Sequence, residues 1–596
     1  MSYRAPSRDM QFVINELADL AAVAALPAYR DQEVNGELVA AVLEEAGRLA
    51  SEVLEPLNVP GDRHKARWTE AGVQAVPGFR EAYEQFVAGG WNGLVCPTEY
   101  QGQGLPELLN IATQEMWNAA NFSFALCPLL TAGAVEALHH HGSPEQKTRL
   151  LEKMVSGEWT GTMNLTESQA GSDLSAVRTR AIPEGDHYRI QGQKIYITWG
   201  DHDMTDNIIH LVLARTPDAP EGVKGISLFV VPKFLLNEDG SPGEANDLRC
   251  VSIEHKLGIH ASPTCVMAYG DNGGAMGYLV GEENRGLAYM FTMMNEARLK
   301  VGLQGLAIAD RAYQQALDYA RQRVQGRPAG AREGERVTII HHPDVRRMLM
   351  TMKSQVEAMR AVCYTTAAAM DMARHHPEDA VRAAHQSRAD LLIPVVKAWC
   401  TELGVELTSL GIQVQGGMGY VEEAGAAQFL RDARIATIYE GTTGIQGNDL
   451  VGRKLAQDGG RAMLALLEEM RAVERQLAQA GEELEPLQRN FGEALEALAG
   501  ATDWCVTTLS REPDAVLAQA VNYLMLTGYV CGGWQLARAA LLAREHLAAG
   551  EEPAFHEAKL VTARFYAEQI LPRARALATT VRSGGIATLA LSEEQF

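Results

Sequence analysis

The feature that most limits the fold of this chain is a change in hydrophobic period, which occurs twice. Up to about residue 155, apolar residues recur at helical spacing. From about 156 to 285 they form short strand-like runs, such as Ile208 to Ala214, separated by Gly, Pro, Asn and Asp. After Gly286 the helical period returns. Because no long helices lie between the short runs, we predict an antiparallel barrel or sandwich flanked by helical regions.

This α+β multidomain pattern divides the 596 residues into five segments, which agrees with a prior of roughly 150 residues per domain. We predict an N-terminal extension (1–35), an N-terminal helical domain (36–155), a middle β-domain (156–285), a C-terminal four-helix bundle (286–455) and an additional helical domain (456–596). Helices are expected at 36–57, 78–88, 104–118, 133–140, 287–324, 343–374, 377–410 and 445–455.

The overall charge and the cysteines exclude several classes of protein. A net charge of −22 argues against binding to nucleic acid. The 8 cysteines form no CxxC pair, so we expect free thiols in a reducing compartment. No apolar signal region follows Met1, which favours the cytoplasm. Two uncharged stretches, 116–135 and 515–537, contain Asn, Gln, Pro or Gly, so we interpret them as buried helices and expect no membrane span.

The first candidate site is the small-residue loop from Leu165 to Asp173, which carries Thr166, Gly171 and Ser172. Small side chains let backbone N–H groups approach a ligand, and hydroxyl groups can bind a carbonyl, a ring nitrogen or a phosphate. Taken alone, an ordinary polar loop between domains is the commoner explanation.

The second candidate is the strand Lys194 to Thr198, whose period of two predicts Tyr196 and Thr198 on one face. An aromatic ring beside a hydroxyl group suits a flat ligand with many heteroatoms. An ordinary cross-strand aromatic pair explains the pattern equally well.

The third candidate is the segment Gln413 to Tyr420, where Gly416, Gly417 and Gly419 interrupt a helical region. Such a break predicts a tight loop or a close approach of backbone to another group. The GGxG spacing follows a helix and is no Rossmann fingerprint, and the sequence contains no Walker loop.

The fourth candidate is the segment from Asp432 to Asn448, in which Glu440 precedes a Gly-Thr-Thr-Gly turn that opens a helix. A carboxylate at this place lies near free N–H groups that can hold a developing oxyanion. The alternative is a glutamate that only complements the helix dipole. The triple histidine at 139–141 is expected to end a helix, without a carboxylate at helical spacing, and we predict no metal site.

Together these four segments resemble one family, the acyl-CoA dehydrogenases. The TE-x-x-AGSD loop, the KIYIT strand, the Q-x-x-GG-x-G loop and IYEGTTGIQ match its signatures over about residues 36 to 455. The longer frame, with a trailing helical domain, resembles the long subfamily typified by 3-methylmercaptopropionyl-CoA dehydrogenase.

The resemblance implies FAD as the cofactor and acyl-CoA as the substrate. Residues implied in FAD binding are Leu165, Thr166, Gly171, Ser172, Tyr196, Thr198, Arg323, Gln413, Gly416, Gly417, Thr442 and Gly444. Those implied at the substrate are Ser172, Arg298 and Gly441. Arg323 and the Gln413 loop are expected to serve the FAD of a neighbouring subunit, which implies a homodimer.

The reaction implied is α,β-dehydrogenation of a fatty or 3-methylmercaptopropionyl thioester to the trans-2-enoyl-CoA. Glu440 is the expected base, hydride passes to flavin N5, and electron-transferring flavoprotein is the expected acceptor. Some members carry the base at the position of Ala297, which cannot take a proton, and neighbouring Glu296 is expected to form a surface ion pair with Lys300. Two alternatives stay open: an acyl-CoA oxidase that uses oxygen, and a non-catalytic helical scaffold that has lost the flavin.

Overall fold

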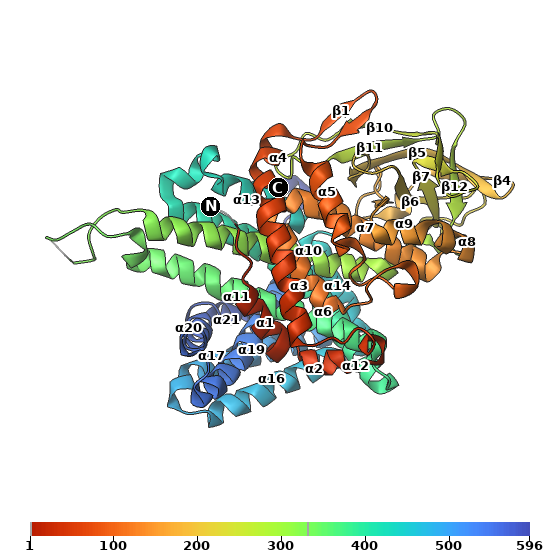
Figure 1. Ribbon diagram of the computed structural model, residues 1–596. Helices are drawn as coiled ribbons and strands as arrows, with labels where there is room; N and C mark the ends of the chain where they lie inside the picture. Colours follow the sequence, from red (N-terminus) through yellow and green to blue (C-terminus); the bar gives the residue numbers. More distant parts are fainter. Residues whose placement is uncertain (1–2, 331–332) are drawn as a thin grey trace.

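The computed structural model describes residues 3–330 and 333–596. A helical body lies at the centre, with the β-domain on one side and the additional helical domain below it in the view of Figure 1. Buried apolar residues of the N-terminal segments, the bundle and the additional domain form one continuous cluster, which includes Trp199 and Ile259 of the β-domain. Most buried apolar residues of the β-domain belong to two further clusters.

The N-terminal part is helical, as predicted, apart from the short hairpin of β1 (Arg67–Thr69) and β2 (Gly72–Gln74). Asn35 begins α3 by accepting hydrogen bonds from the backbone N–H groups of Glu37 and Leu38. The helices are α1 (Ser7–Phe12), α2 (Leu20–Ala24), α3 (Gly36–Leu49), α4 (Asn58–His64), α5 (Phe79–Ala88), α6 (Glu107–Ala120), α7 (Phe122–His141), α8 (Pro144–Gln146) and α9 (Glu152–Ser156).

Helix α7 begins much earlier than the predicted 133–140. Asn121 caps it through the N–H of Phe124, and Pro128 lies inside the helix. Within the described residues, α7 is the single helix long and apolar enough to cross a membrane by length and composition. Its apolar window is 78% buried against other elements, which is the arrangement of a core helix.

The β-domain is an eight-stranded sheet in the order β10-β11-β5-β12-β7-β6-β3, with β4 paired to β5. The prediction of an antiparallel arrangement is wrong at one pair, because β3 and β6 run parallel from Thr160↔Ile208 to Asn164↔Val212. The sheet strands are β3 (Thr160–Asn164), β4 (Arg180–Glu184), β5 (His187–Thr198), β6 (Ile208–Ala214), β7 (Ser227–Pro232), β10 (Leu248–Ile253), β11 (Thr264–Tyr269) and β12 (Ala275–Leu279), and β8 (Phe234–Leu236) pairs with β9 (Pro242–Ala245).

Long antiparallel helices make up the C-terminal bundle: α10 (Gly286–Gln322), α11 (Pro343–His375) and α12 (Asp379–Gln415), followed by α13 (Ala426–Ala433) and α14 (Thr443–Asp449). Gly305 of α10 lies against the backbone of Cys400, and Gly404 of α12 lies against Gly305. A Cβ at either glycine would overlap backbone atoms, so these residues set the close approach of α10 and α12.

The additional domain continues from a π-helical segment (Leu450–Leu455) and packs onto the bundle through α19. Gly528 and Gly532 of α19 face the indole of Trp399 on α12, and most residues of the uncharged stretch from 523 to 537 are buried, whereas Leu517 and Val521 are exposed. Its helices are α15 (Ala456–Asp458), α16 (Arg461–Gln479), α17 (Glu485–Leu509), α18 (Pro513–Leu517), α19 (Ala520–Ala549), α20 (Pro553–Gln569) and α21 (Pro572–Arg582). The cysteines are all buried and free, as predicted from their spacing.

Candidate active site

Glu440 lies in a turn between α13 and α14 and adopts a left-handed backbone conformation. Its φ is +54°, and that of Gly441 is +88°. A non-glycine residue in this region costs about 1–3 kcal/mol and persists only where its surroundings hold it. The partly buried side chain of Glu440 forms no hydrogen bond with any described residue.

The side chain of Gln446 holds this turn in place. Its Nε2 donates to the carbonyl oxygens of Glu440 at 3.1 Å and Gly441 at 3.2 Å. Thr442 caps α14 by accepting from the N–H of Ile445, and the Thr443 hydroxyl donates to Glu402 on α12 at 2.5 Å. The turn is therefore anchored from inside its own helix and from α12.

The backbone N–H of Glu440 makes no hydrogen bond in the described part of the chain. A free N–H beside a carboxylate, at the start of a helix, can hold a developing negative charge on a carbonyl oxygen. This part of the site offers a base and a donor for an oxyanion within one residue.

Two buried cations face Glu440 from the bundle. Arg298 of α10 forms an ion pair with Asp449 at 3.0 Å, and Lys397 of α12 is fully buried. Burial raises the pKa of Glu440 above its ordinary range, while the positive charges of Arg298 and Lys397 oppose that rise. A carboxylate with a raised pKa is a better base at neutral pH.

The loop from Leu165 to Asp173 is fixed from below by the buried carboxylate of Glu167. It accepts from the Lys194 ammonium at 2.8 Å, the Thr179 hydroxyl at 2.5 Å and the Arg178 N–H at 2.8 Å. Burial alone would raise the pKa of Glu167, but Lys194 and these hydrogen bonds lower it to about 2. A permanently charged anchor thus shapes the loop.

The predicted ligand groups of this loop differ in how free they are. The Leu165 carbonyl accepts from Lys194 at 3.0 Å and the Thr166 carbonyl accepts from the Ile195 N–H at 3.0 Å, which joins the loop to β5. The Thr166 hydroxyl forms no hydrogen bond among the described residues. Gly171 and Ser172 are exposed, and a Cβ at Gly171 would meet no atom within 4 Å.

Tyr196 and Thr198 lie at a bulge of β5 rather than in a regular strand. The pairing with β11 shifts between Cys265↔Ile197 and Met267↔Lys194, and Tyr196 has a φ of +60°. Its ring is 60% exposed, Thr198 is partly buried, and Ile197 between them is buried. The bulge presents the Tyr196 ring to solvent beside the Thr166 loop.

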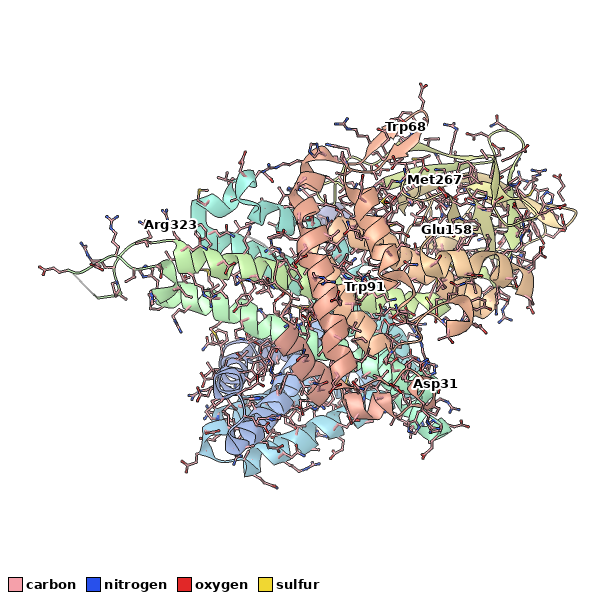
Figure 2. All side chains as sticks on the ribbon, viewed as in Figure 1. Asp31, Trp68, Trp91, Glu158, Met267 and Arg323 are labelled. Carbon is pink, nitrogen blue, oxygen red and sulfur yellow. The ribbon has the colours of Figure 1, made fainter. Side chains whose placement is uncertain are left out.

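Further predicted cofactor residues are Arg323, Gln413, Gly416 and Gly417. None of them forms a hydrogen bond with Glu440 in the described part of the chain. Arg323 ends α10 at the base of an arm that projects from the body, far from Met267 of the β-domain in Figure 2. Gln413 lines a cavity of about 360 Å³ together with Arg347 of α11 and Arg573 of α21. Gly416 and Gly417 are exposed, with no atom within 4 Å of a Cβ built on either.

The prediction of a surface ion pair for Glu296 is wrong about its location. Glu296 does pair with Lys300, but both side chains are buried, and Arg374 of α11 also binds Glu296 at 3.1 Å. Helical spacing predicted the pair, while burial depended on α11, which is distant in sequence. Ala297 is buried beside it and offers no group that takes a proton.

The triple histidine has a carboxylate at helical spacing, which the sequence analysis overlooked. Glu136 lies one turn before His140 and accepts from its Nε2 at 3.1 Å. Glu136, His139 and His140 place ligand atoms within 4.8 Å of one another, a group that could hold a metal ion. Arg374 also contacts Glu136 at 3.4 Å and competes for the same oxygen.

Several residues that shape the site were missed. Gln446 lies at the end of the IYEGTTGIQ segment, six residues after Glu440. The sequence motif assigned roles to Glu440, Thr442 and the glycines and none to Gln446. Lys397 interrupts the apolar run Pro394 to Cys400, and a single charge in such a run is a usable signal. Glu167 was part of the first loop but was treated as an ordinary loop residue.

Comparison with family models places the chain. The acyl-CoA dehydrogenase N-terminal, middle and C-terminal domain models match residues 37–158, 162–271 and 284–455, and the acetyl-CoA dehydrogenase C-terminal-like model matches 466–592. The chain belongs to the acyl-CoA dehydrogenase family, a family of FAD-dependent oxidoreductases.

The relatives that match over nearly the whole chain include the following two. It is 50% identical to 3-methylmercaptopropionyl-CoA dehydrogenase of Ruegeria pomeroyi, covering 99% of this chain and 100% of that one. It is 35% identical to the broad-specificity linear acyl-CoA dehydrogenase FadE5 of Mycobacterium tuberculosis, covering 96% of each. The structure of an acyl-CoA dehydrogenase complexed with FAD from Bacillus anthracis shares the fold, with a TM-score of 0.75 at 19% identity and coverage of 95% and 90%. The predicted resemblance to the long subfamily is confirmed.

The residues of the β-domain fit FAD, the cofactor of this family. A flat ring system needs an exposed aromatic or apolar face and hydrogen-bond partners at its edge, which Tyr196 and the unbonded Thr166 hydroxyl offer. A pyrophosphate needs open backbone, which Gly171 offers.

Proposed function

We propose that this chain oxidises an acyl-CoA thioester to the trans-2-enoyl-CoA, with Glu440 as the base that removes the α-proton. The observation that carries this proposal is the unbonded, partly buried carboxylate of Glu440, held in a strained turn beside its own free N–H. A strained residue that forms no stabilising bond is typical of a catalytic position.

The mechanism follows from what these groups can do. FAD held by Tyr196 and the Thr166 loop would supply an acceptor for the β-hydrogen as hydride. Glu440 takes the proton from the α-carbon, and the Glu440 N–H holds the negative charge that develops on the thioester oxygen. Arg298, paired to Asp449, keeps positive charge next to the base. Gln446 fixes the turn through its hydrogen bonds to the carbonyl oxygens of Glu440 and Gly441, and this keeps the Glu440 carboxylate and the Glu440 N–H directed toward the substrate.

For the substrate, we propose a short acyl-CoA of the 3-methylmercaptopropionyl type. The support is the 50% identity to the Ruegeria pomeroyi enzyme over the full length, against 35% to the linear acyl-CoA enzyme. Anaerobic addition of a panel of acyl-CoAs to the FAD-loaded protein tests this. We expect the thioether substrate to bleach the flavin fastest. Faster bleaching by butyryl-CoA or longer chains would contradict the substrate, and no bleaching at all would contradict the reaction.

We propose electron-transferring flavoprotein as the electron acceptor. An acyl-CoA oxidase would use the same base and would pass the electrons to oxygen instead. Oxygen consumption in air separates the two. We expect slow reoxidation in air and fast reoxidation by electron-transferring flavoprotein, and the reverse result would identify an oxidase.

A homodimer in the cytoplasm is also proposed. Arg323 lies at the base of a projecting arm (Figure 2), and Gln413, Gly416 and Gly417 are exposed, as expected if these residues serve the FAD of a second subunit. The mass of the protein in solution and the flavin content of Arg323→Ala test the assembly. A flavin-saturated monomer would contradict it.

A further inference from the structure

Lys397 is a charged residue in a buried, apolar part of the bundle. It lies on α12 within the run Pro394 to Cys400, every residue of which is buried, and its own exposure is 0%. The Lys397 Nζ forms no hydrogen bond with any described residue. An unpaired buried ammonium is costly, so its retention at this place requires a reason.

Three charged groups face this ammonium: Glu440, Arg298 and Glu402. Arg298 is a cation and already bonds Asp449 at 3.0 Å. Glu402 already accepts the Thr443 hydroxyl at 2.5 Å. Glu440 is the one carboxylate of this set that has no bonded partner among the described residues, so it is the group that gains most from the charge of Lys397.

We propose that Lys397 is a positioning residue for the base: its buried, unbonded ammonium supplies the nearby charge that keeps Glu440 a carboxylate, free to turn toward the α-carbon. This inference rests on the proposed function. A direct ion pair would hold the carboxylate in one orientation and weaken it as a base. A charge a short distance away stabilises the carboxylate without occupying its oxygens.

The charges balance during the reaction as follows. The proton moves from the α-carbon to a carboxylate oxygen of Glu440, and the electron pair of the broken C–H bond stays with the substrate. Glu440 becomes neutral while negative charge appears on the thioester nearby. Negative charge therefore stays near the ammonium of Lys397 throughout: on the Glu440 carboxylate before the transfer and on the thioester during it. Burial lowers the pKa of Lys397 to about 8 despite Glu440, so this charge is present at neutral pH and is lost in alkali.

The first test compares Lys397→Met with the wild-type enzyme in its FAD-loaded form. The probe is an acyl-CoA with sulfur in place of the β-carbon, which has an acidic α-hydrogen but no β-hydride to transfer. Its deprotonation by Glu440 is followed through the absorbance of the flavin complex as a function of pH. We expect the midpoint to rise by about one pH unit or more in the variant. With the 3-methylmercaptopropionyl substrate, flavin reduction at pH 7 should be at least about 10-fold slower, and the two enzymes should converge above pH 8.

Two further variants separate this role from simple packing. Lys397→Arg keeps the charge and should retain the wild-type midpoint. Lys454→Met removes another lysine of the same region, paired with Asp390 at 3.4 Å, and should leave the midpoint unchanged. A Lys397→Met protein that is less stable but has the wild-type midpoint would overturn the proposal.

A second measurement does not depend on turnover or on the folding of Lys397→Met. If Glu440 is the counter-charge of Lys397, Glu440→Gln should lower the melting temperature more at pH 6.5 than at pH 9, where Lys397 is largely neutral. Combining Glu440→Gln with Lys397→Met should restore part of that loss. An equal effect at both pH values would overturn the proposal. The melting temperatures could show the coupling between Glu440 and Lys397 while no acyl-CoA reduced the flavin of the wild-type protein. That result would contradict the proposed function and would still support the charge interaction between Glu440 and Lys397.

Discussion

Two buried charged clusters lie on the same helical bundle and are built in opposite ways. In the first, which we term the Arg360 network, Arg360 of α11 binds Glu115 of α6 and Asp9 of α1, and Lys559 of α20 binds Asp9 and Glu357. Every carboxylate named here has a direct bond. In the second, Glu440 faces Arg298 and Lys397 without a direct bond.

The difference separates charges that hold the fold from the charge that we propose as the reacting group. Burial alone would raise the pKa of Asp9, but Lys559 and Arg360 hold it below its ordinary range. Asp9, with its lowered pKa, is a poor base. Burial raises the pKa of Glu115 despite Arg360, but both oxygens of Glu115 are occupied by hydrogen bonds from Arg360 and Tyr364. Glu440 is partly buried near cations but unbonded, and the pKa of its carboxyl group is raised. The strained turn at Glu440 locally costs stability, and the unbonded carboxylate of Glu440 remains free to accept a proton.

The largest expected effect that tests this contrast is that of Glu440→Gln on chemistry. The amide keeps the size of the side chain but cannot take the proton, and removal of a general base typically slows a reaction by about 10²- to 10⁴-fold. The variant should purify with FAD, bind acyl-CoA with a change in the flavin spectrum, and fail to bleach in stopped-flow measurements.

Glu296→Gln is the control for the base. Because Glu296 is buried between Lys300 and Arg374, this variant should be less stable, yet each flavin-loaded molecule should be reduced at a sizeable fraction of the wild-type rate. Flavin reduction by Glu440→Gln at nearly the wild-type rate would show that another residue is the base.

Arg360→Met should have the opposite profile. Removing the cation leaves Glu115 buried without its main partner and Asp9 paired with Lys559 alone, and such a loss costs about 3–5 kcal/mol of folding free energy. Urea unfolding should detect this loss. The rate of flavin reduction in the molecules that remain folded should change by less than about twofold, and a large fall in that rate would mean that the two clusters are coupled.

Gly441→Ala tests the turn that holds the base. A Cβ at this position, with φ +88°, would lie 2.8 Å from the Gln446 Nε2, so both the backbone and the hydrogen bonds of Gln446 are disturbed. We expect a loss of about 1–3 kcal/mol in stability and slower flavin reduction. Gly452→Ala, where the nearest atom is 3.7 Å away, is the matched control and should be nearly neutral in both measurements.

The smallest expected effect is the pH dependence of the wild-type enzyme. Burial raises the pKa of Glu440, and only the ionised form accepts a proton, so the rate of flavin reduction should rise with pH through that raised pKa. Stopped-flow rates between pH 5 and pH 8 measure the midpoint. If the rate of flavin reduction had its pH midpoint in the ordinary range of an exposed glutamate, Glu440 would be solvent-exposed in the complex with substrate.

Local sequence patterns predicted the parts of this molecule that local forces determine. Hydrophobic period predicted the long helices α10 and α11 and the buried strand β6. The glycine and threonine residues after Glu440 predicted its place before a capped helix. Strand β3, with the sequence TGTMN, was missed because it has no apolar alternation and exists through its pairing with β6.

The parts that escaped prediction depend on partners distant in sequence. Glu296 is buried only because α11 supplies Arg374, and Lys397 faces Glu440 only because α12 packs beside α14. The roles of Arg323, Gln413 and the other cofactor residues stay predictions, since they concern contacts with FAD and a second subunit.

The pairing of Asp9 with Lys559 bears on how the chain folds during synthesis. The two residues are 550 positions apart, and both belong to the Arg360 network. At about 5–20 residues per second, Asp9 emerges roughly half a minute to two minutes before its lysine partner is made. Until then α1 and α11 carry buried charges that are incompletely paired. The final assembly of the Arg360 network therefore waits for the synthesis of α20, the helix that carries Lys559.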